Sequence, residues 1–373
     1  MSPNPTMTSR QRMAAVLRGE IPDRVPFHPS YYYDHAFQVM GKRFEDFIID
    51  PRLGNPLMVQ TALRYRTDTV RMGTVPDDEW FANKIVREED GQVIQYDRRT
   101  GKAEGIYDVA GGGDFKPFEP PTPVRTLQDV REIPVMSRVE WLQRGYFRGM
   151  RECIEEAHRH GLFTVGFCTG QTLNFLVDML GGPEPALLAF YDEPELVHAL
   201  FDKAVEISIE KAKALVEVGI DLAYIGDSYA SGSVISAETY VTFCAPAYRR
   251  MADAVRQMGV FTYKHCCGFY NPLLEHVPAT GVDAMDGIDP TTGMTVRHTK
   301  EVIAGRITII GGLSCLTLLN GTPDEVYAEA TECIRQGKPG GRYVLGSACA
   351  IPRLTPPENI DAARQAIEDH GWY

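Results

Sequence analysis

Histidine and cysteine lie close together in the segment Tyr-Lys-His-Cys-Cys-Gly, residues 263–268. His265 and Cys267 are two positions apart, so on an extended backbone their side chains face the same side. Imidazole and thiolate are ligands that zinc prefers, and a catalytic zinc site combines three protein ligands with one open position. The pair supplies two such ligands, and Cys349, 82 positions later (349 − 267), is the candidate for the third.

The remaining cysteines fit other roles. Cys266 faces away from its two neighbours on extended backbone, so we expect it to be structural. A cysteine outside a ligand-spaced pair is more often a small buried apolar side chain than a ligand. Cys153, Cys244 and Cys333 fall inside helical patterns, so we expect them to serve packing, whereas Cys168 and Cys315 lie near the rim but belong to no ligand-spaced pair.

Eight short apolar runs, mostly separated by helical patterns, predict the strands that must position these residues. They are Arg24–Phe27, Thr67–Met72, Phe163–Cys168, Asp221–Gly226, Val260–His265, Val282–Met285, Ile307–Gly311 and Arg342–Leu345. Strands that alternate with helices in this number predict an α/β fold, a (β/α)8 barrel, with residues 1–373 as a single domain. A doubly wound open sheet is the alternative.

A helical pattern precedes the first strand. Residues 8–19 carry Met13, Val16 and Leu17 at helical spacing and end at Gly19, a usual helix terminator. We expect this N-terminal extension to be a helix outside the regular alternation.

Residues 74–134 break the alternation and predict a β-rich insertion that caps one end of the barrel. Residues 80–86, 92–96 and 105–109 are typical of antiparallel ribbons around the turn at Asp90-Gly91. Gly111, Gly112 and Gly113 lack the following Lys-Ser or Lys-Thr of a phosphate loop, so we interpret them as a connector.

Barrel enzymes keep their active residues at the carboxyl ends of the strands, and polar candidates fall there in turn. His28 follows the first predicted strand, Gln171 the third, Asp227 and Tyr229 the fourth, His265 and Cys267 the fifth, Asp286 the sixth, and Cys349 the eighth. The barrel would therefore bring Cys267 and Cys349 to one rim although they are far apart in sequence. Three soft ligands on one rim favour a metal site over packing.

Asp227 opens the loop after an apolar strand and is the candidate catalytic residue. Three roles fit it: a fourth metal ligand, a proton donor, or the cap of the next helix.

Tyrosines 31–33 follow the first strand and could form an apolar wall with phenol groups for a ring-bearing substrate, or ordinary aromatic core. The candidate substrate-binding residues are His28, Tyr31, Tyr32, Gln171, Asn174 and Tyr229.

Composition excludes some partners. The 50 Asp and Glu outnumber the 38 Lys and Arg, and a formal net charge of −12 repels nucleic acid and anionic membranes. We see neither a signal peptide nor an apolar run of membrane-spanning length, so a cytoplasmic protein with reduced thiols is expected. The oligomeric state stays open, with a homodimer as one option.

Several phrases along the chain carry a family resemblance. They are the segment from Arg12 to Phe27, His265-Cys266-Cys267-Gly268, Gly281-Val-Asp-Ala284, Gly321-Thr-Pro-Asp-Glu-Val326 and Thr355-Pro-Pro-Glu-Asn359. In these the chain resembles the uroporphyrinogen decarboxylase superfamily, and its zinc-dependent, corrinoid-linked methyltransferase branch in particular. That branch's His-x-Cys and distant Cys match His265, Cys267 and Cys349.

The resemblance implies methyl transfer between a small substrate and the cobalt of a corrinoid (cobalamin) carried by a separate protein, with Zn²⁺ as the metal. The tyrosine wall favours O-demethylation of an aryl methyl ether, and methylation of a thiol acceptor is the alternative. The decarboxylase itself grips its substrate through an Arg-rich segment after the first strand, whereas residues 28–37 contain no Arg. Decarboxylation is therefore a further alternative, as is a non-catalytic docking partner of the corrinoid protein.

Overall fold

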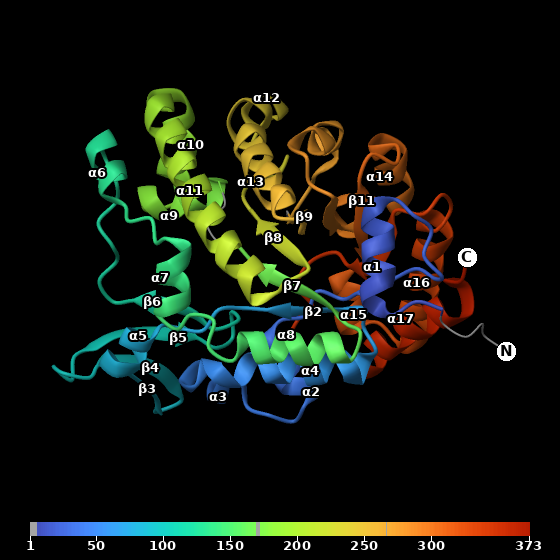
Figure 1. Cartoon of the computed structure of the whole chain (residues 1–373), viewed down its shortest axis with the longest axis horizontal. Coiled ribbons are helices and arrows are strands. Elements are labelled where there is room, and N and C mark those ends of the chain that lie inside the picture. Colours follow the sequence, from blue (N-terminus) through green and yellow to red (C-terminus); the bar gives the residue numbers. More distant parts are fainter. Residues whose placement is uncertain (1–5, 169–171, 266) are drawn as a thin grey trace.

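The computed structural model describes residues 6–168, 172–265 and 267–373 (Figure 1). Eight parallel strands form a nearly closed barrel in the order β1-β12-β11-β10-β9-β8-β7-β2. Their bounds are β1 Phe27–His28, β2 Thr69–Met72, β7 Phe163–Phe167, β8 Leu222–Gly226, β9 Phe261–His265, β10 Ala284–Ile288, β11 Thr308–Leu313 and β12 Tyr343–Ser347. Strands that follow one another in the chain from β7 to β12 are also neighbours in the sheet, and β1 pairs with β12. This order confirms the predicted (β/α)8 barrel over the doubly wound sheet.

The strand register makes the carboxyl ends of the strands level. Gly226 at the end of β8 pairs with His265 at the end of β9, and His28 at the end of β1 pairs with Gly346 near the end of β12. The loops after these strands therefore meet at one rim, which we call the mouth of the barrel.

Helices surround the strands (Figure 1). Their bounds are α1 Ser9–Arg18, α2 Tyr33–Val39, α3 Phe44–Ile49, α4 Gly54–Tyr65, α5 Asp78–Asn83, α6 Leu127–Glu132, α7 Arg138–Gln143, α8 Met150–Arg159, α9 Thr172–Leu180, α10 Pro183–Asp192, α11 Pro194–Val218, α12 Ala237–Thr239, α13 Ala245–Gln257, α14 Val296–Ile303, α15 Cys315–Asn320, α16 Pro323–Gly337 and α17 Pro357–His370. Between β9 and β10 the chain forms a 3-10 helix, Asn271–Thr280, in which Pro278 cannot donate an α-helical hydrogen bond. In the described part of the chain no helix combines the length and apolarity needed to cross a membrane.

Helix α1 closes the base of the barrel, opposite the mouth. Thr8 and Gln11 form a capping box at its start, and Gly19 ends it with a φ of 85°. Its apolar face, including Met13 and Leu17, packs against Phe163 and other interior barrel side chains. The N-terminal extension predicted from the sequence is therefore a helix, and it serves as the floor of the barrel.

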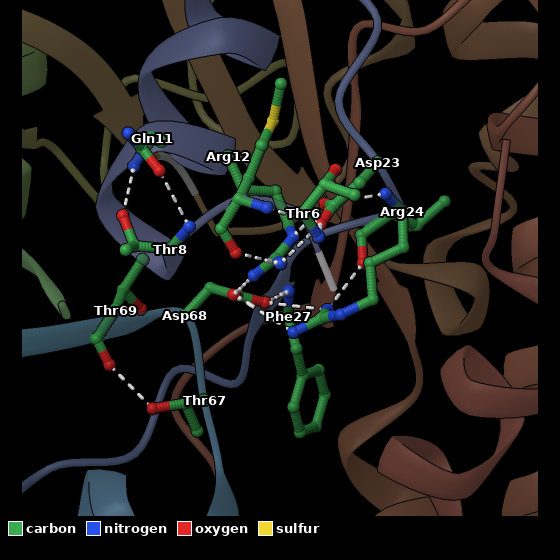
Figure 2. Close-up of polar contacts among 12 residues, drawn as sticks. Thr6, Thr8, Gln11, Arg12, Asp23, Arg24, Phe27, Thr67, Asp68 and Thr69 are labelled. Atoms are coloured by element: carbon green, nitrogen blue, oxygen red, sulfur yellow. Dashed lines mark hydrogen bonds and ion pairs between the residues drawn. The ribbon is translucent and has the colours of Figure 1, made fainter. Parts of the chain in front are cut away.

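A buried group of charges fixes α1 to the first two strands; we call Arg12, Asp23, Arg24 and Asp68 the basal cluster. Asp68 accepts hydrogen bonds from Arg12 Nη1 at 2.5 Å, from Arg24 Nη1 at 3.0 Å and from the Phe27 amide at 2.7 Å (Figure 2). Arg12 also binds Asp23. Burial opposes ionisation of Asp68, but Arg24 and Arg12 outweigh it and hold its pKa well below the ordinary value.

A separate four-stranded antiparallel sheet lies beside α3, at the lower left of Figure 1. Its strands are β3 Lys84–Glu89, β4 Gln92–Asp97, β5 Ala103–Asp108 and β6 Asp114–Pro117. Val86 and Val93 of this sheet pack against Phe44 and Ile48 of α3. The connector at residues 111–113 joins β5 to β6.

The ribbon predicted at residues 80–86 is wrong in its first half, because Asp78–Asn83 form helix α5. The side chain of Asp77 accepts a hydrogen bond from the Trp80 amide at 2.9 Å and so caps this helix. The strand begins only at Lys84.

Candidate metal centre

The loops after β9 and β12 bring His265, Cys267 and Cys349 together at the mouth; we call these three residues the triad. His265 Nε2 lies 3.1 Å from Cys267 Sγ and 3.9 Å from Cys349 Sγ, and the two sulfur atoms are 3.3 Å apart. His265 is buried, while both cysteines are partly exposed. The predicted convergence of one nitrogen and two sulfurs is present in the structure.

The triad fits a tetrahedral zinc ion. With zinc–ligand bonds of about 2.0–2.3 Å, tetrahedral ligand atoms lie about 3.3–3.8 Å from one another. The observed separations of 3.1, 3.3 and 3.9 Å are close to these values. Three protein ligands would leave room for a further ligand, and Cys267 and Cys349 are the partly exposed members of the triad.

Asp286 of β10 holds the imidazole of His265. Its Oδ1 lies 2.6 Å from His265 Nδ1, so the hydrogen on Nδ1 is committed to the carboxylate and Nε2 faces the two sulfurs. Histidine ligands of metals commonly have a carboxylate partner of this kind, which fixes the ring and raises its basicity. From the sequence we expected Asp286 at the end of a strand but assigned it no role.

Charge interactions prepare the triad for a cation. The hydrogen bond with Cys267 lowers the pKa of Cys349 most. Burial opposes this shift, and His265 adds to it, so that the pKa of Cys349 falls to about 4. Burial would lower the pKa of His265, but Asp286 outweighs burial and raises it to about 9. Cys349 is therefore held as thiolate, the form that binds metals, and a metal at Nε2 would displace the imidazole proton.

Arg71 of β2 lies inside the barrel beneath the triad; we call Arg71, Asp286 and His265 the mouth cluster. Arg71 Nη2 lies 3.7 Å from Asp286 Oδ2. It donates a hydrogen bond to the hydroxyl of Tyr263 and another, at 3.0 Å, to the hydroxyl of Ser30. Sequence reasoning missed this arginine. The available signal was Arg71 itself, a cation near the end of the predicted strand Thr67–Met72.

His28 is fully enclosed at the end of β1. Its Nδ1 lies 2.5 Å from Thr69 Oγ1 and its Nε2 lies 3.3 Å from the Tyr263 hydroxyl. Burial, with the charges of Arg71 and His265, lowers the pKa of His28 well below its ordinary value, so the ring is neutral. The predicted substrate residue thus belongs to the packed interior below the mouth.

The three adjacent tyrosines separate. Tyr31 is 3% exposed and packs in the core against His35 and Tyr65. The hydroxyl of Tyr33 donates to Asn55 and is likewise turned inward. Tyr32 alone of the three lies over Arg71, 5.1 Å from ring centre to guanidinium carbon, so the predicted wall is reduced to one ring.

Asp227, the predicted catalytic residue, is fully buried and anchors helix α9. It accepts hydrogen bonds from the amides of Leu173 and Asn174, both at 3.0 Å, and from the hydroxyls of Thr172 and Tyr248. These contacts cap helix α9, whereas the cap considered from the sequence was that of the next helix; the metal-ligand and proton-donor roles of Asp227 stay predictions.

The other two predicted residues of this region lie beside Asp227. Asn174 Oδ1 accepts a hydrogen bond from the Tyr229 amide at 3.1 Å and so ties α9 to the loop after β8. The side chain of Tyr229 is 36% exposed. Gln171 lies outside the described residues.

Residues 114–370, more than half of the chain, match the model of the uroporphyrinogen decarboxylase (URO-D) family. The chain therefore belongs to this family. A solved structure described as a methyltransferase from Methanosarcina mazei superimposes with a TM-score of 0.74, covering 97% of this chain and 99% of that one at 22% identity. This likeness shows the fold.

The curated relatives that this chain matches are named for different reactions. The chain is 33% identical over 178 residues to a methylated-thiol–coenzyme M methyltransferase of Methanosarcina mazei, covering 48% of this chain and 46% of that protein. It is 31% identical over 176 residues to the methylcobamide:CoM methyltransferase MtaA of Methanosarcina barkeri, covering 46% and 49%. A uroporphyrinogen decarboxylase of Myxococcus xanthus is 27% identical over 260 residues, covering 67% and 70%. The chain thus spans about half the length of the methyltransferases that it matches.

Proposed function

We propose that this protein moves a methyl group between the corrinoid of a separate protein and a small thiol, at a zinc ion held by His265, Cys267 and Cys349. The observation that carries the proposal is the approach of one imidazole nitrogen and two sulfurs to within 3.1–3.9 Å. Relatives named as methylcobamide:CoM methyltransferases support the corrinoid partner.

When bound, zinc would hold the thiol substrate as its thiolate, the nucleophilic form of the group. The chain's own residues prepare this site. Asp286 fixes the tautomer and orientation of His265, and the low pKa of Cys349 keeps that ligand deprotonated. Partial exposure of Cys267 and Cys349 leaves a side on which two substrates, one brought by a partner protein, can approach.

A thiol fits the mouth better than the aryl methyl ether that the tyrosine run suggested. Tyr31 is in the core and Tyr33 is turned inward, so a wall of stacked phenol rings does not form. The names of two relatives specify a methylated thiol or coenzyme M. We therefore propose the thiol as the small substrate.

Decarboxylation of a porphyrinogen is less well supported. A polycarboxylate needs several cations on leaving water. Residues 28–37 carry no arginine, and Arg71 is already engaged with Asp286 and Tyr263.

Zinc content and methyl transfer test the proposal together. We expect about one zinc per chain, and we expect Cys349→Ser to lose most of it along with demethylation of methylcobalamin in the presence of thiols. Cys315→Ser is the matched control. Cys315 also follows a barrel strand, but its sulfur is directed to the Ala350 carbonyl at 3.5 Å and burial raises its pKa to about 12.

Full zinc retention in Cys349→Ser would contradict the metal site. Methyl transfer from methoxyaromatics but not to thiols would favour O-demethylation, and release of carbon dioxide from uroporphyrinogen would favour the decarboxylase. Binding of a corrinoid protein with no methyl transfer from any donor would indicate a non-catalytic partner.

A further inference from the structure

We propose that Arg71 is a positioning residue for the metal centre: it holds the carboxylate of Asp286, and through that carboxylate the ring of His265, in the orientation that binds the ion. This inference rests on the proposed metal site but does not depend on methyl transfer.

The contacts form a continuous path from strand β2 to the triad. Arg71 Nη2 lies 3.7 Å from Asp286 Oδ2, and the other carboxylate oxygen of Asp286 lies 2.6 Å from His265 Nδ1. Arg71 is 4% exposed and Asp286 is 2% exposed, so water does not screen their attraction. The same Nη2 donates to the Tyr263 hydroxyl, which fixes the guanidinium against the strand that also carries His265.

The charges at the mouth also require this arginine. The carboxyl group of Asp286 is 2% exposed and is not one of the three proposed ligands, so its charge needs a partner within the protein. His28, the neighbouring ring on β1, is neutral and cannot balance it. Among the described residues, Arg71 and His265 lie within ion-pair distance of Asp286, and Arg71 is the one of the two that is not itself a proposed metal ligand. Without Arg71, the buried carboxylate of Asp286 would keep only its contact with His265 and would lose the charge that faces its other oxygen, which is unfavourable.

The contacts of the Arg71 guanidinium group differ from those of an arginine whose only role is stability. Its Nε is buried and has no hydrogen-bond partner within the described residues. Aromatic rings take the place of acceptors around the guanidinium carbon, with Tyr32 at 5.1 Å, Tyr224 at 5.2 Å and Phe167 at 5.8 Å. A packing role would be met more fully by an apolar side chain, so the charge next to Asp286 explains the residue.

The test is zinc affinity, measured by competition with a chromophoric chelator on the purified full chain. We expect Arg71→Met to raise the zinc dissociation constant about 10- to 100-fold, as loss of an outer partner of a ligand commonly does. Arg71→Lys keeps the positive charge and should recover part of the affinity. If Arg71→Met does not fold, Arg71→Lys carries the test, with a severalfold weaker affinity expected because a lysine cannot bind Tyr263 and Asp286 in the same planar geometry.

A double variant separates positioning from a general effect on the fold. If Arg71 acts through Asp286, Arg71→Met adds little to the loss of zinc affinity already caused by Asp286→Asn. Arg24→Met, in the basal cluster, is the matched control: it should lower the melting temperature and leave the zinc dissociation constant unchanged.

Two results would overturn the inference: wild-type zinc affinity in Arg71→Met and Arg71→Lys, or full additivity of the Arg71 and Asp286 substitutions. A wild-type protein that binds no zinc would overturn the proposed metal site and this inference together. Normal zinc binding by the wild type, weakened in Arg71→Met, with no methyl transfer to any thiol, would refute the proposed reaction and leave the inference standing.

Discussion

Two buried carboxylates, Asp68 at the base of the barrel and Asp286 at its mouth, face arginines in different ways. Asp68 accepts hydrogen bonds from two arginines and from the Phe27 amide. Asp286 has one arginine at 3.7 Å, and its shorter contact is to a histidine whose other nitrogen faces two sulfurs. The basal cluster is complete within the protein, whereas the mouth cluster leads to a set of atoms suited to an added ion.

The difference teaches which buried charges serve stability and which serve a ligand. A buried ion pair whose donors and acceptors are matched contributes to the fold when intact and damages it when broken. The mouth cluster leads to an imidazole nitrogen and two sulfur atoms that lie 3.3 Å apart, an arrangement that an added ion would complete. Substitutions at the two ends should therefore affect different measurements.

The largest effect on stability should come from Asp68→Ala. It leaves Arg12 and Arg24 buried without their shared carboxylate, so we expect a loss of about 3–5 kcal/mol in the free energy of unfolding. Urea unfolding measures this loss. Zinc affinity of the folded protein should be unchanged; a loss of zinc binding would break the comparison between the two ends.

Acid should remove the contribution that Asp68 makes to stability at the base of the barrel. The pKa of Asp68 is depressed in the folded protein, so its contribution is present above the unfolded value of about 3.9 and is lost as the pH falls below it toward the folded pKa. The difference in free energy of unfolding between wild type and Asp68→Ala should therefore be constant from pH 7 to 5 and shrink below pH 4. A constant difference down to pH 2.5 would contradict the assignment.

Asp286→Asn should act on metal binding more than on stability. Loss of the charge that orients His265 should weaken zinc binding about 10- to 100-fold, equivalent to about 1.4–2.7 kcal/mol. Chelator competition gives the affinity, and urea unfolding should show a smaller change than for Asp68→Ala. The reverse order of the two effects would mean that Asp286 is a structural residue like Asp68.

The smallest effect should come from Asp227→Asn, near the mouth but outside the mouth cluster. An amide can replace some of the hydrogen bonds that anchor α9, so we expect a loss of about 1–2 kcal/mol in stability. The rate of methyl transfer should fall less than about tenfold. A fall of about 10²- to 10⁴-fold with unchanged zinc content would restore Asp227 as a proton donor.

Sequence reasoning could find the triad because its evidence is local. The spacing of His265 and Cys267 sets their common face, and the position of Cys349 after the last strand depends only on counting strands. The barrel likewise follows from alternation, which is a property of neighbouring residues.

The mouth cluster could not be found in this way. Arg71 meets Asp286 across the interior of the barrel, between strands that are not neighbours in the sheet, so their contact depends on tilt and register. Tyr31 and Asp227 were assigned from their places at strand ends, but which side chains turn inward depends on the packing of α2 and α9. Such contacts between distant elements are set by the completed fold.

The floor formed by α1 has a consequence for how the protein is made. The Val16 carbonyl accepts a hydrogen bond from Thr308 Oγ1, 292 residues later, and Met13 and Leu17 pack in the same apolar group as Val344. This helix leaves the ribosome long before the strands that bury its apolar face, so that face stays exposed to solvent through most of synthesis. Ribosome-bound intermediates should therefore expose this apolar surface to chaperones until β11 and β12 have emerged.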